Sequence, residues 1–182
     1  DNTDGVGLVR DIAVNAGVPL KGARVLVVGA GGASAGVLGP LLEAGVRELT
    51  LANRTLSNAL VVAGRHTALA TACGVELRTA PLDKPGEAYD IVINASASSL
   101  AGESVPVSPR VLRAGALALD MMYGPPAQGF LDWAARHGAQ PRDGLGMLVE
   151  QAAESFEIWR GVRPPSAQVL DELRAEMAHP AA

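Results

Sequence analysis

The chain has little cysteine, no long apolar run and no surplus of positive charge, and each shortage excludes a class of protein. Cys73 is the single cysteine in 182 residues, so the sequence excludes an internal disulfide and a cysteine metal cluster. We expect it to fill an apolar gap near a helix end. No apolar run approaches the ~20 residues that a membrane-spanning helix needs. The net charge of -4 argues against nucleic acid as the main partner, because proteins bind phosphate backbones with surplus Lys and Arg.

The start of the sequence lacks an initiator methionine, and nothing there resembles a signal peptide. Because the residues after Asp1 already belong to a motif described below, the sequence predicts a fragment of a longer, cytoplasmic protein. Its 48% hydrophobic content suffices for one compact domain with a substantial core. No internal boundary is visible, so we expect one domain over residues 1–182, with its oligomeric state left open.

Strand-like and helix-like segments alternate along the chain, joined by short connections that contain Gly or Pro. The predicted strands are mostly continuous apolar runs, as in a sheet covered on both faces. They span 24–29, 48–52, 75–79, 90–94, 116–121 and 140–141. The predicted helices span 5–16, 33–44, 56–73, 108–114, 130–137, 147–159 and 166–177. This order predicts an α/β fold with a doubly wound, Rossmann-type parallel sheet, helices on both faces and extra C-terminal helices.

A glycine-rich turn follows the first predicted strand and consists of Gly29, Ala30, Gly31, Gly32 and Ala33. A pyrophosphate reaches a helix N-terminus only where side chains are absent and backbone N–H groups point outward. The third glycine of the usual G-x-G-x-x-G pattern is replaced by Ser34, which is still small enough for close packing. The turn is also compatible with a plain strand-to-helix connection or a methyltransferase loop, but its context favours a dinucleotide.

The end of the second predicted strand indicates which dinucleotide binds. An acidic residue there would hydrogen-bond the ribose of NAD, but the chain has Asn53, Arg54 and Thr55 instead. A guanidinium pairs well with a 2′-phosphate, and the Thr hydroxyl and helix-start amides add donors, so NADP is favoured. The alternative is that Arg54 is an ordinary surface charge and Thr55 an ordinary helix cap.

Six motifs together carry a resemblance to a known family. They are Asn2-Thr3-Asp4-Gly5, Gly29-Ala30-Gly31-Gly32-Ala33, Asn53-Arg54-Thr55, Ile93-Asn94-Ala95-Ser96, Asp120-Met121-Met122-Tyr123 and Asp143-Gly144-Leu145-Gly146-Met147-Leu148-Val149-Glu150-Gln151-Ala152-Ala153. In this order they resemble the shikimate dehydrogenases, and the first and last motifs are the most discriminating. The resemblance covers nearly the whole chain and implies the NADP-binding half of an enzyme that reduces 3-dehydroshikimate to shikimate in aromatic amino acid biosynthesis. It also implies that the amino-terminal substrate-binding half is missing.

The resemblance assigns catalysis to Asp4. In the family, a lysine from the other half and this aspartate face each other across a cleft. Hydride transfer to a ketone generates an alkoxide that needs a proton, which a lysine held by a carboxylate supplies. Asp4 would orient the substrate hydroxyl and the lysine, which this sequence does not contain. Without the resemblance, Asp4 would be interpreted as a turn or helix cap.

The same resemblance implies further site residues. The amide of Gln151 would hydrogen-bond a hydroxyl of shikimate, and Tyr123 would lie beside the substrate. Met121 and Gly144 would approach the nicotinamide, and Ser96 would belong to a cofactor-side loop. Spacing alone would instead interpret Met121 as core, Gly144 as a turn glycine, and Gln151 and Tyr123 as ordinary helix and half-buried residues.

Departures from the family pattern leave alternatives open. Asn58 stands where many NADP-dependent members have a second basic residue, and Ala35 stands where some members have Arg. With Arg54 alone facing the 2′-phosphate, the preference for NADP over NAD is expected to be modest. An NAD-dependent quinate/shikimate dehydrogenase and a non-catalytic nucleotide-binding module therefore remain alternatives, and the isolated domain is expected to be inactive. No metal site is expected, because His66, His137 and His179 lie far apart without Cys or carboxylate neighbours at ligand spacing.

Overall fold

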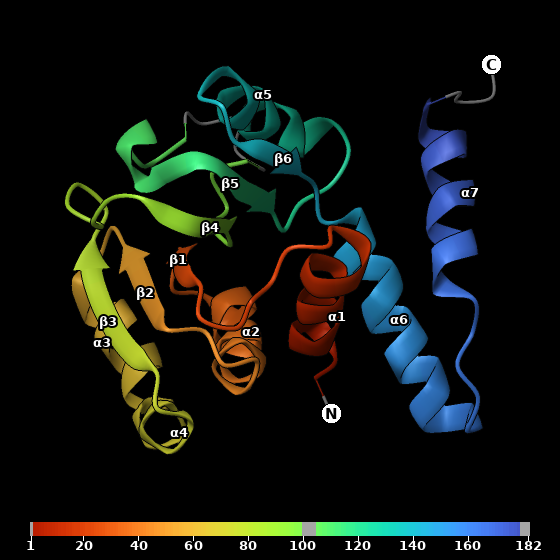
Figure 1. Cartoon of the computed structure of the whole chain (residues 1–182), viewed down its shortest axis with the longest axis horizontal. Coiled ribbons are helices and arrows are strands. Elements are labelled where there is room, and N and C mark those ends of the chain that lie inside the picture. The colour runs from red at the N-terminus through yellow and green to blue at the C-terminus, as the bar shows by residue number, and fades with distance from the viewer. Residues whose placement is uncertain (1, 100–104, 179–182) are drawn as a thin grey trace.

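The computed structural model describes residues 2–99 and 105–178, in which six parallel strands form one sheet (Figure 1). The strand order is β3-β2-β1-β4-β5-β6. The strands are β1 (Arg24–Val28), β2 (Glu48–Asn53), β3 (Glu76–Pro81), β4 (Tyr89–Asn94), β5 (Leu112–Asp120) and β6 (Gln140–Arg142). This order reverses direction between β1 and β4, which is the point where doubly wound folds bind their ligands.

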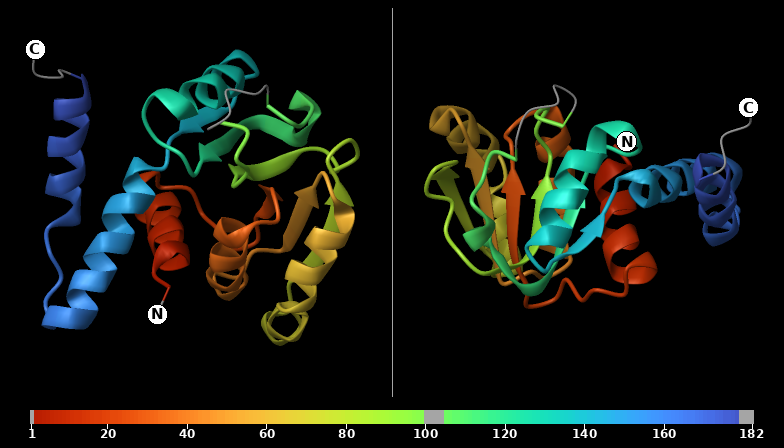
Figure 2. Two further views of the ribbon diagram at one scale, coloured as in Figure 1. Left: turned by 180° about the vertical axis from the view of Figure 1, so that it is seen from behind. Right: turned by 90° about the horizontal axis from the view of Figure 1, so that it is seen from above.

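Helices cover both faces of the sheet, which confirms the predicted fold class. One face carries α1 (Asp4–Arg10), α2 (Gly32–Glu43), α3 (Leu56–Gly64) and α4 (Thr67–Cys73), and the other carries α5 (Gln128–Arg136). The last two helices are α6 (Leu145–Arg160) and α7 (Ser166–Ala178). They extend to the side of the sheet beyond α1, as both views of Figure 2 show.

The core is divided between the two faces because side chains alternate along each strand. Val25 and Val27 of β1 belong to the cluster under α1 to α4, whereas Leu26 and Val28 belong to the cluster under α5. All four are 0–1% exposed. A strand buried on both sides explains why this segment is a continuous apolar run.

Two predicted helices are interrupted. The helix predicted over 56–73 is divided between α3 and α4. At the break, His66 Nδ1 lies 2.9 Å from Val62 O and Thr67 Oγ1 donates to Ala63 O at 3.2 Å. The helix predicted over 5–16 is α1 followed by a π-helical turn over Asp11–Asn15.

The helix predicted over 108–114 is wrong. Only a 3-10 turn, Pro109–Val111, forms there, with Ser108 Oγ accepting from Arg110 N at 3.3 Å. Leu112 then begins β5 and pairs with Tyr89 of β4. Pairing with a distant strand overrides the local helix preference of these residues.

The environment of the single cysteine differs from the expected one. Cys73 ends α4 and is exposed, so the prediction that it fills an apolar gap is wrong. Among residues 2–99 and 105–178, no helix is both long and apolar enough to cross a membrane. Nor do three or more His, Cys, Asp or Glu side chains of this part of the chain gather where they could hold a metal ion. His179 lies outside the described residues.

Helix α1 packs very closely between α2 and α6 because it carries glycines. A Cβ on Gly5 would lie 2.7 Å from Gly36 O of α2, and one on Gly7 would lie 2.7 Å from Gln151 N of α6. Across the same interface, the Thr3 and Ser155 hydroxyls are 3.0 Å apart. The amino-terminal motif and the α6 motif are therefore brought together by backbone contact.

Candidate functional site

A groove of about 530 Å³ lies at the carboxyl ends of the central strands. Its wall is formed by the loops after β1, β2 and β4, with contributions from the loops after β3 and β5. The lining residues are Val28, Gly29, Ala30, Gly31, Gly32, Ala33, Asn53, Arg54, Leu82, Ala95, Ser96, Ala97, Ser98, Pro106 and Met122. This edge of an open parallel sheet is where ligands bind, and eight of the residues predicted for cofactor binding lie here.

The glycines in the loop after β1 are explained in two different ways. Gly29 has a φ of +103°, and a Cβ there would lie 3.0 Å from Ala95 O and Ser96 N, so the fold itself requires glycine. Gly31 has an ordinary φ of −96°, and apart from the adjoining backbone no atom of residues 2–99 and 105–178 lies within 4 Å of the Cβ positions of Gly31 or Gly32. Among the described residues, nothing explains these two glycines, whereas a closely approaching ligand backbone or phosphate would.

Two polar side chains hold the glycine turn over residues 29–33, which we call the glycine cradle, and the loop after β2. Ser34, at the position of the missing third glycine, is fully buried and donates from Oγ to Gly29 O at 2.6 Å. Asn53 Oδ1 accepts from Ala30 N at 3.1 Å, while its Nδ2 donates to Thr55 O at 2.9 Å. Asn53 therefore joins the glycine turn to the loop that carries the basic residue.

Arg54 supplies the positive charge of the groove. It is exposed, lines the groove, and makes no ion pair or hydrogen bond with the described residues. Thr55 precedes α3 as its N-cap but does not line the groove and caps nothing with its side chain. Asn58 and Ala35 add no second cation. The guanidinium is thus available to an anion at the end of β2.

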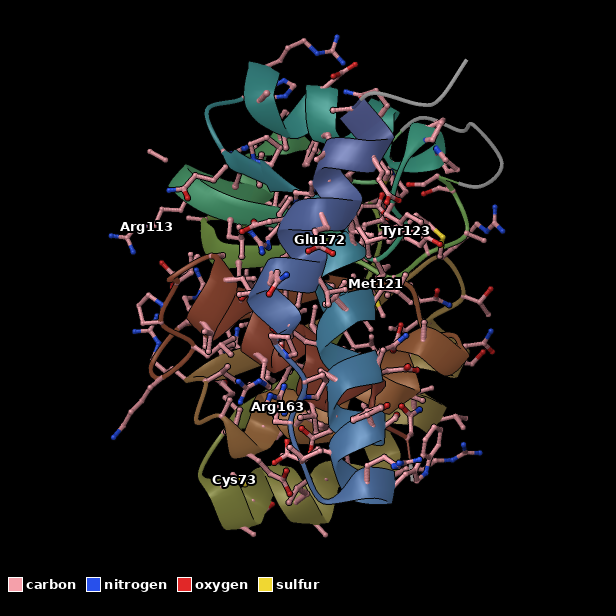
Figure 3. All side chains as sticks on the ribbon, turned by 90° about the vertical axis from the view of Figure 1, so that its right-hand side faces the viewer. Cys73, Arg113, Met121, Tyr123, Arg163 and Glu172 are labelled. Atoms are coloured by element: carbon pink, nitrogen blue, oxygen red, sulfur yellow. The ribbon has the colours of Figure 1, made fainter. Side chains whose placement is uncertain are left out.

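The opposite end of the groove differs from the sequence-based expectation. Ser96 lines the groove as expected, but Met122 lines it in place of Met121. Met121 packs half-buried against the core, and a Cβ on Gly144 would clash with its carbonyl oxygen. Met121 and Gly144 therefore hold the start of α6 against the end of β5, near Tyr123 (Figure 3).

The residues predicted to contact the substrate lie outside this groove. Asp4 begins α1, and Gln151 lies on α6 where the two helices touch. Gln151 Oε1 is buried without a hydrogen-bond partner among the described residues. Tyr123 is 45% exposed, and within the described part of the chain its side chain makes no hydrogen bond to either of them. The structure brings Asp4 and Gln151 onto adjoining helices, whereas Tyr123 lies in the segment after β5.

A buried carboxylate holds α6 in place beside Gln151. Glu150 is 2% exposed, and it accepts from Arg10 Nε at 3.1 Å, Arg163 Nη2 at 2.8 Å, Asn15 Nδ2 at 3.3 Å and Ser166 Oγ at 2.9 Å. Burial by itself would raise the pKa of Glu150, but these bonds hold its pKa below the ordinary 4.5. Figure 3 labels Arg163, which follows α6 and joins it to the segment before α7.

The lowered pKa predicts acid sensitivity. A carboxylate whose pKa is lower in the folded state stabilises that state above its unfolded pKa, and this stabilisation disappears as pH falls through the folded pKa. We expect Glu150→Gln to cost about 2–3 kcal/mol of unfolding free energy at pH 7, with a smaller difference from the wild type below pH ~4. Urea unfolding between pH 7 and 3 measures this. A difference that does not shrink with acid would contradict the linkage.

The sequence reasoning missed some residues of this region. Leu82, Pro106 and Met122 line the groove without any local signal, whereas the serines of 96–99 offered one. Asp120, the last residue of β5, belongs to one of the six motifs, but the sequence predicted no role for its side chain. It is fully buried; burial raises its pKa above the ordinary 3.8, against the opposing bonds from Ser99, Met122 and Asn94.

Comparisons with known proteins agree with these features. The model of the family described as shikimate / quinate 5-dehydrogenase matches residues 11–102, and that of the shikimate 5′-dehydrogenase C-terminal domain matches residues 144–174. The shikimate dehydrogenase (NADP(+)) of Methylibium petroleiphilum is 69% identical over 175 residues, which cover 96% of this chain and 60% of that protein.

Solved structures match over most of the chain. An Ael1 enzyme from Pseudomonas putida matches with a TM-score of 0.84 and 44% identity, over 94% of this chain and 62% of that one. The shikimate 5-dehydrogenase of Thermus thermophilus, solved with NADP(H) and shikimate, matches with a TM-score of 0.75 and 32% identity, over 96% and 62%. The chain spans about 60% of the length of the curated relative. Since the first family model matches half of its 182 residues, the chain belongs to the shikimate / quinate 5-dehydrogenase family.

Proposed function

We propose that this chain is the NADP-binding part of a shikimate dehydrogenase, which reversibly reduces 3-dehydroshikimate to shikimate. The observation that carries the proposal is a single groove that combines an open glycine cradle, at Gly31 and Gly32, with the exposed guanidinium of Arg54. The names of the relatives, including one solved with NADP(H) and shikimate, support the same cofactor and substrate.

The residues of the groove fit a phosphorylated dinucleotide. The N-terminus of α2 directs backbone N–H groups at the cradle, where they would bind a pyrophosphate. Arg54 would pair with the 2′-phosphate at the end of β2, next to a loop held by Asn53. When bound, the nicotinamide supplies or accepts the hydride. The roles of this part of the chain are to hold the pyrophosphate and the 2′-phosphate and to orient the nicotinamide half over β4 and β5.

Asp4 and Gln151 would complete the substrate side. In this proposal, the Gln151 amide bonds a substrate hydroxyl. The role is supported by its Oε1, which has no hydrogen-bond partner among the described residues. The Asp4 carboxylate orients a substrate hydroxyl and the ammonium of a lysine in a substrate-binding domain contributed by the rest of the protein. That lysine donates the proton that the developing alkoxide requires. Tyr123 is proposed beside the substrate.

The proposed substrate-binding domain needs a surface on which to pack. An apolar groove of about 360 Å³ lies between α6 and α7, and Phe156 and Trp159 of α6 are 43% and 78% exposed. These side chains support contact with further protein. The cytoplasmic location expected from the sequence stays a prediction.

The cofactor assignment is tested by replacing the groove cation. Arg54→Ala is expected to weaken NADPH binding roughly tenfold and to change NADH binding little, because only NADPH carries the 2′-phosphate. Calorimetric titration of both cofactors measures this. The control is Arg65→Ala, an exposed arginine at the other end of α3. Equal losses for the two cofactors would overturn the 2′-phosphate assignment.

The alternative is an enzyme of the same family that uses NAD. The lack of a second cation at Asn58 or Ala35 favours it, because Arg54 alone supports a modest preference. A wild-type chain that binds NADH more tightly than NADPH in the same titration would favour this alternative.

A further inference from the structure

The buried carboxylate of Asp120 connects the two loops that form one end of the groove. It lies at the end of β5 and is fully buried. Its Oδ1 accepts from Met122 N at 2.8 Å, and its Oδ2 accepts from Asn94 Nδ2 at 2.9 Å and from Ser99 Oγ. Met122 lines the groove from the β5 side, while Asn94 is the last residue of β4 and precedes the loop on the other side.

In the hydrogen bonds that lead from Asp120 through Asn94 to Ser96, each donor and each acceptor can be assigned. Asn94 donates from Nδ2 to Asp120, so its Oδ1 faces the loop and accepts from Ser96 N at 3.2 Å and from Ser96 Oγ at 2.7 Å. A backbone N–H can only donate, so Ser96 N independently requires this orientation of the Asn94 amide. Asp120 and Ser96 N therefore require the same orientation of the Asn94 amide, one from each side.

The same logic determines the proton of the next hydroxyl. Ser96 donates its single hydroxyl proton to Asn94, so in the 2.7 Å bond between Ser96 Oγ and Ser98 Oγ the donor is Ser98. Ser96 Oγ also accepts from Ser98 N at 3.4 Å. Ser96 has thereby used its donor and both acceptor positions, although it lines the groove. Ser98 has used its proton and retains only lone pairs.

The two walls of the groove consequently differ in hydrogen-bonding character. The glycine turn and the start of α2 offer N–H donors, which suit phosphate oxygens. Ser98, which lines the groove from the loop after β4, offers only an acceptor. In the sheet order, β2 with Arg54 lies on one side of β1 and β4 on the other. A dinucleotide with its 2′-phosphate at Arg54 and its pyrophosphate at the cradle extends its nicotinamide half toward Ser98.

We propose that Asp120 is a positioning residue that orients the Asn94–Ser96–Ser98 chain, so that Ser98 Oγ accepts a hydrogen bond from a hydroxyl or amide N–H in the nicotinamide half of the cofactor. This inference rests on the proposed cofactor site. It also reassigns Ser96 from contacting the cofactor to holding Ser98.

An amide at position 120 cannot maintain this chain. Asparagine has one acceptor oxygen, so its NH₂ group would face either Met122 N–H or the Asn94 NH₂, and two donors would meet in both cases. Turning the Asn94 amide to accept would place its NH₂ against Ser96 N–H. Asp120→Asn is therefore expected to disturb the position of Ser98 from a distance.

The test is calorimetric binding of NADPH and of 2′,5′-ADP, which carries the 2′-phosphate but lacks the nicotinamide half. Ser98→Ala is expected to weaken NADPH binding roughly tenfold, and Asp120→Asn, which acts through Ser98, roughly threefold to tenfold. Neither variant is expected to change binding of 2′,5′-ADP. The double variant is expected to match Ser98→Ala, because Asp120 acts through Ser98.

Controls separate this role from a structural one. Asp90→Asn removes a carboxylate at the opposite end of β4, where it accepts from Arg24 N at 2.9 Å, and is expected to leave both ligands unaffected. If Asp120→Asn fails to fold, Ser98→Ala still decides. Unchanged NADPH binding in Ser98→Ala, or equal losses for both ligands, would overturn this inference but not the proposed cofactor site. A wild-type chain that binds neither ligand would overturn the proposed cofactor site and this inference with it.

Discussion

Asp4→Asn is expected to lower kcat of the complete enzyme by about 10²–10⁴-fold and to leave NADPH affinity nearly unchanged. The amide has the same shape as the carboxylate but cannot hold the charge of a lysine that donates a proton to the alkoxide. The start of α1 should persist, because Asp4 N donates to Asn2 Oδ1 at 2.8 Å through the backbone. Asp4 also lies outside the dinucleotide groove.

Steady-state kinetics with 3-dehydroshikimate and calorimetric titration of NADPH together measure this prediction. Asp171→Asn is the matched control, because this exposed aspartate on α7 has no role in the proposed site. Turnover equal to that of the wild type would refute a catalytic role for Asp4. A parallel loss of NADPH affinity would instead show that the substitution disturbs the packing of α1.

Gly146→Ala is expected to lower the free energy of unfolding by about 3–5 kcal/mol, because it breaks a buried ion pair. A Cβ at this position would overlap Asp11 Oδ1. Asp11 is fully buried and accepts from Arg142 Nε at 2.7 Å and from Asn15 Nδ2 at 3.0 Å. The carboxylate cannot withdraw from the new methyl group without leaving Arg142.

Urea unfolding at pH 7 measures the loss, and Gly129→Ala provides the control. Gly129 is an exposed glycine in the first turn of α5, with no described atom within 4 Å of its Cβ position. Alanine there should stabilise the protein by up to ~1 kcal/mol through helix propensity. If Gly146→Ala unfolded at the wild-type urea concentration, the α6 contact would be less rigid than this overlap implies.

Local sequence patterns predicted the central part of the fold and the glycine turn for which we propose a cofactor role. The apolar runs, the glycines after β1 and the Asn53-Arg54-Thr55 motif each involve residues close in sequence. They can therefore be interpreted without knowing which distant residues they contact. The roles of the glycines could be divided only in the structure. Gly29 is required by a positive φ and by the β4 loop, whereas Gly31 has neither constraint.

The features that sequence reasoning missed depend on distant partners. Leu112 is a strand residue because Tyr89 pairs with it, and no local pattern contains that information. Which of Met121 and Met122 lines the groove depends on the direction in which the chain leaves the end of β5. The hydrogen bonds of Asp120 join it to Asn94 across neighbouring strands, so its position in a motif gave no hint of its environment.

The two edges of the sheet affect how this protein can associate. At one edge, β6 has three residues, and Pro141 in its middle lacks the N–H group that an added strand would need. At the other edge, β3 carries Glu76 and Arg78, whose ion pair of 2.6 Å places charge along the outer strand. Both features oppose extension of the sheet by a foreign strand and so protect against edge-to-edge aggregation. We therefore expect specific assembly to use the helices, because α3, α6 and α7 all carry exposed large apolar side chains.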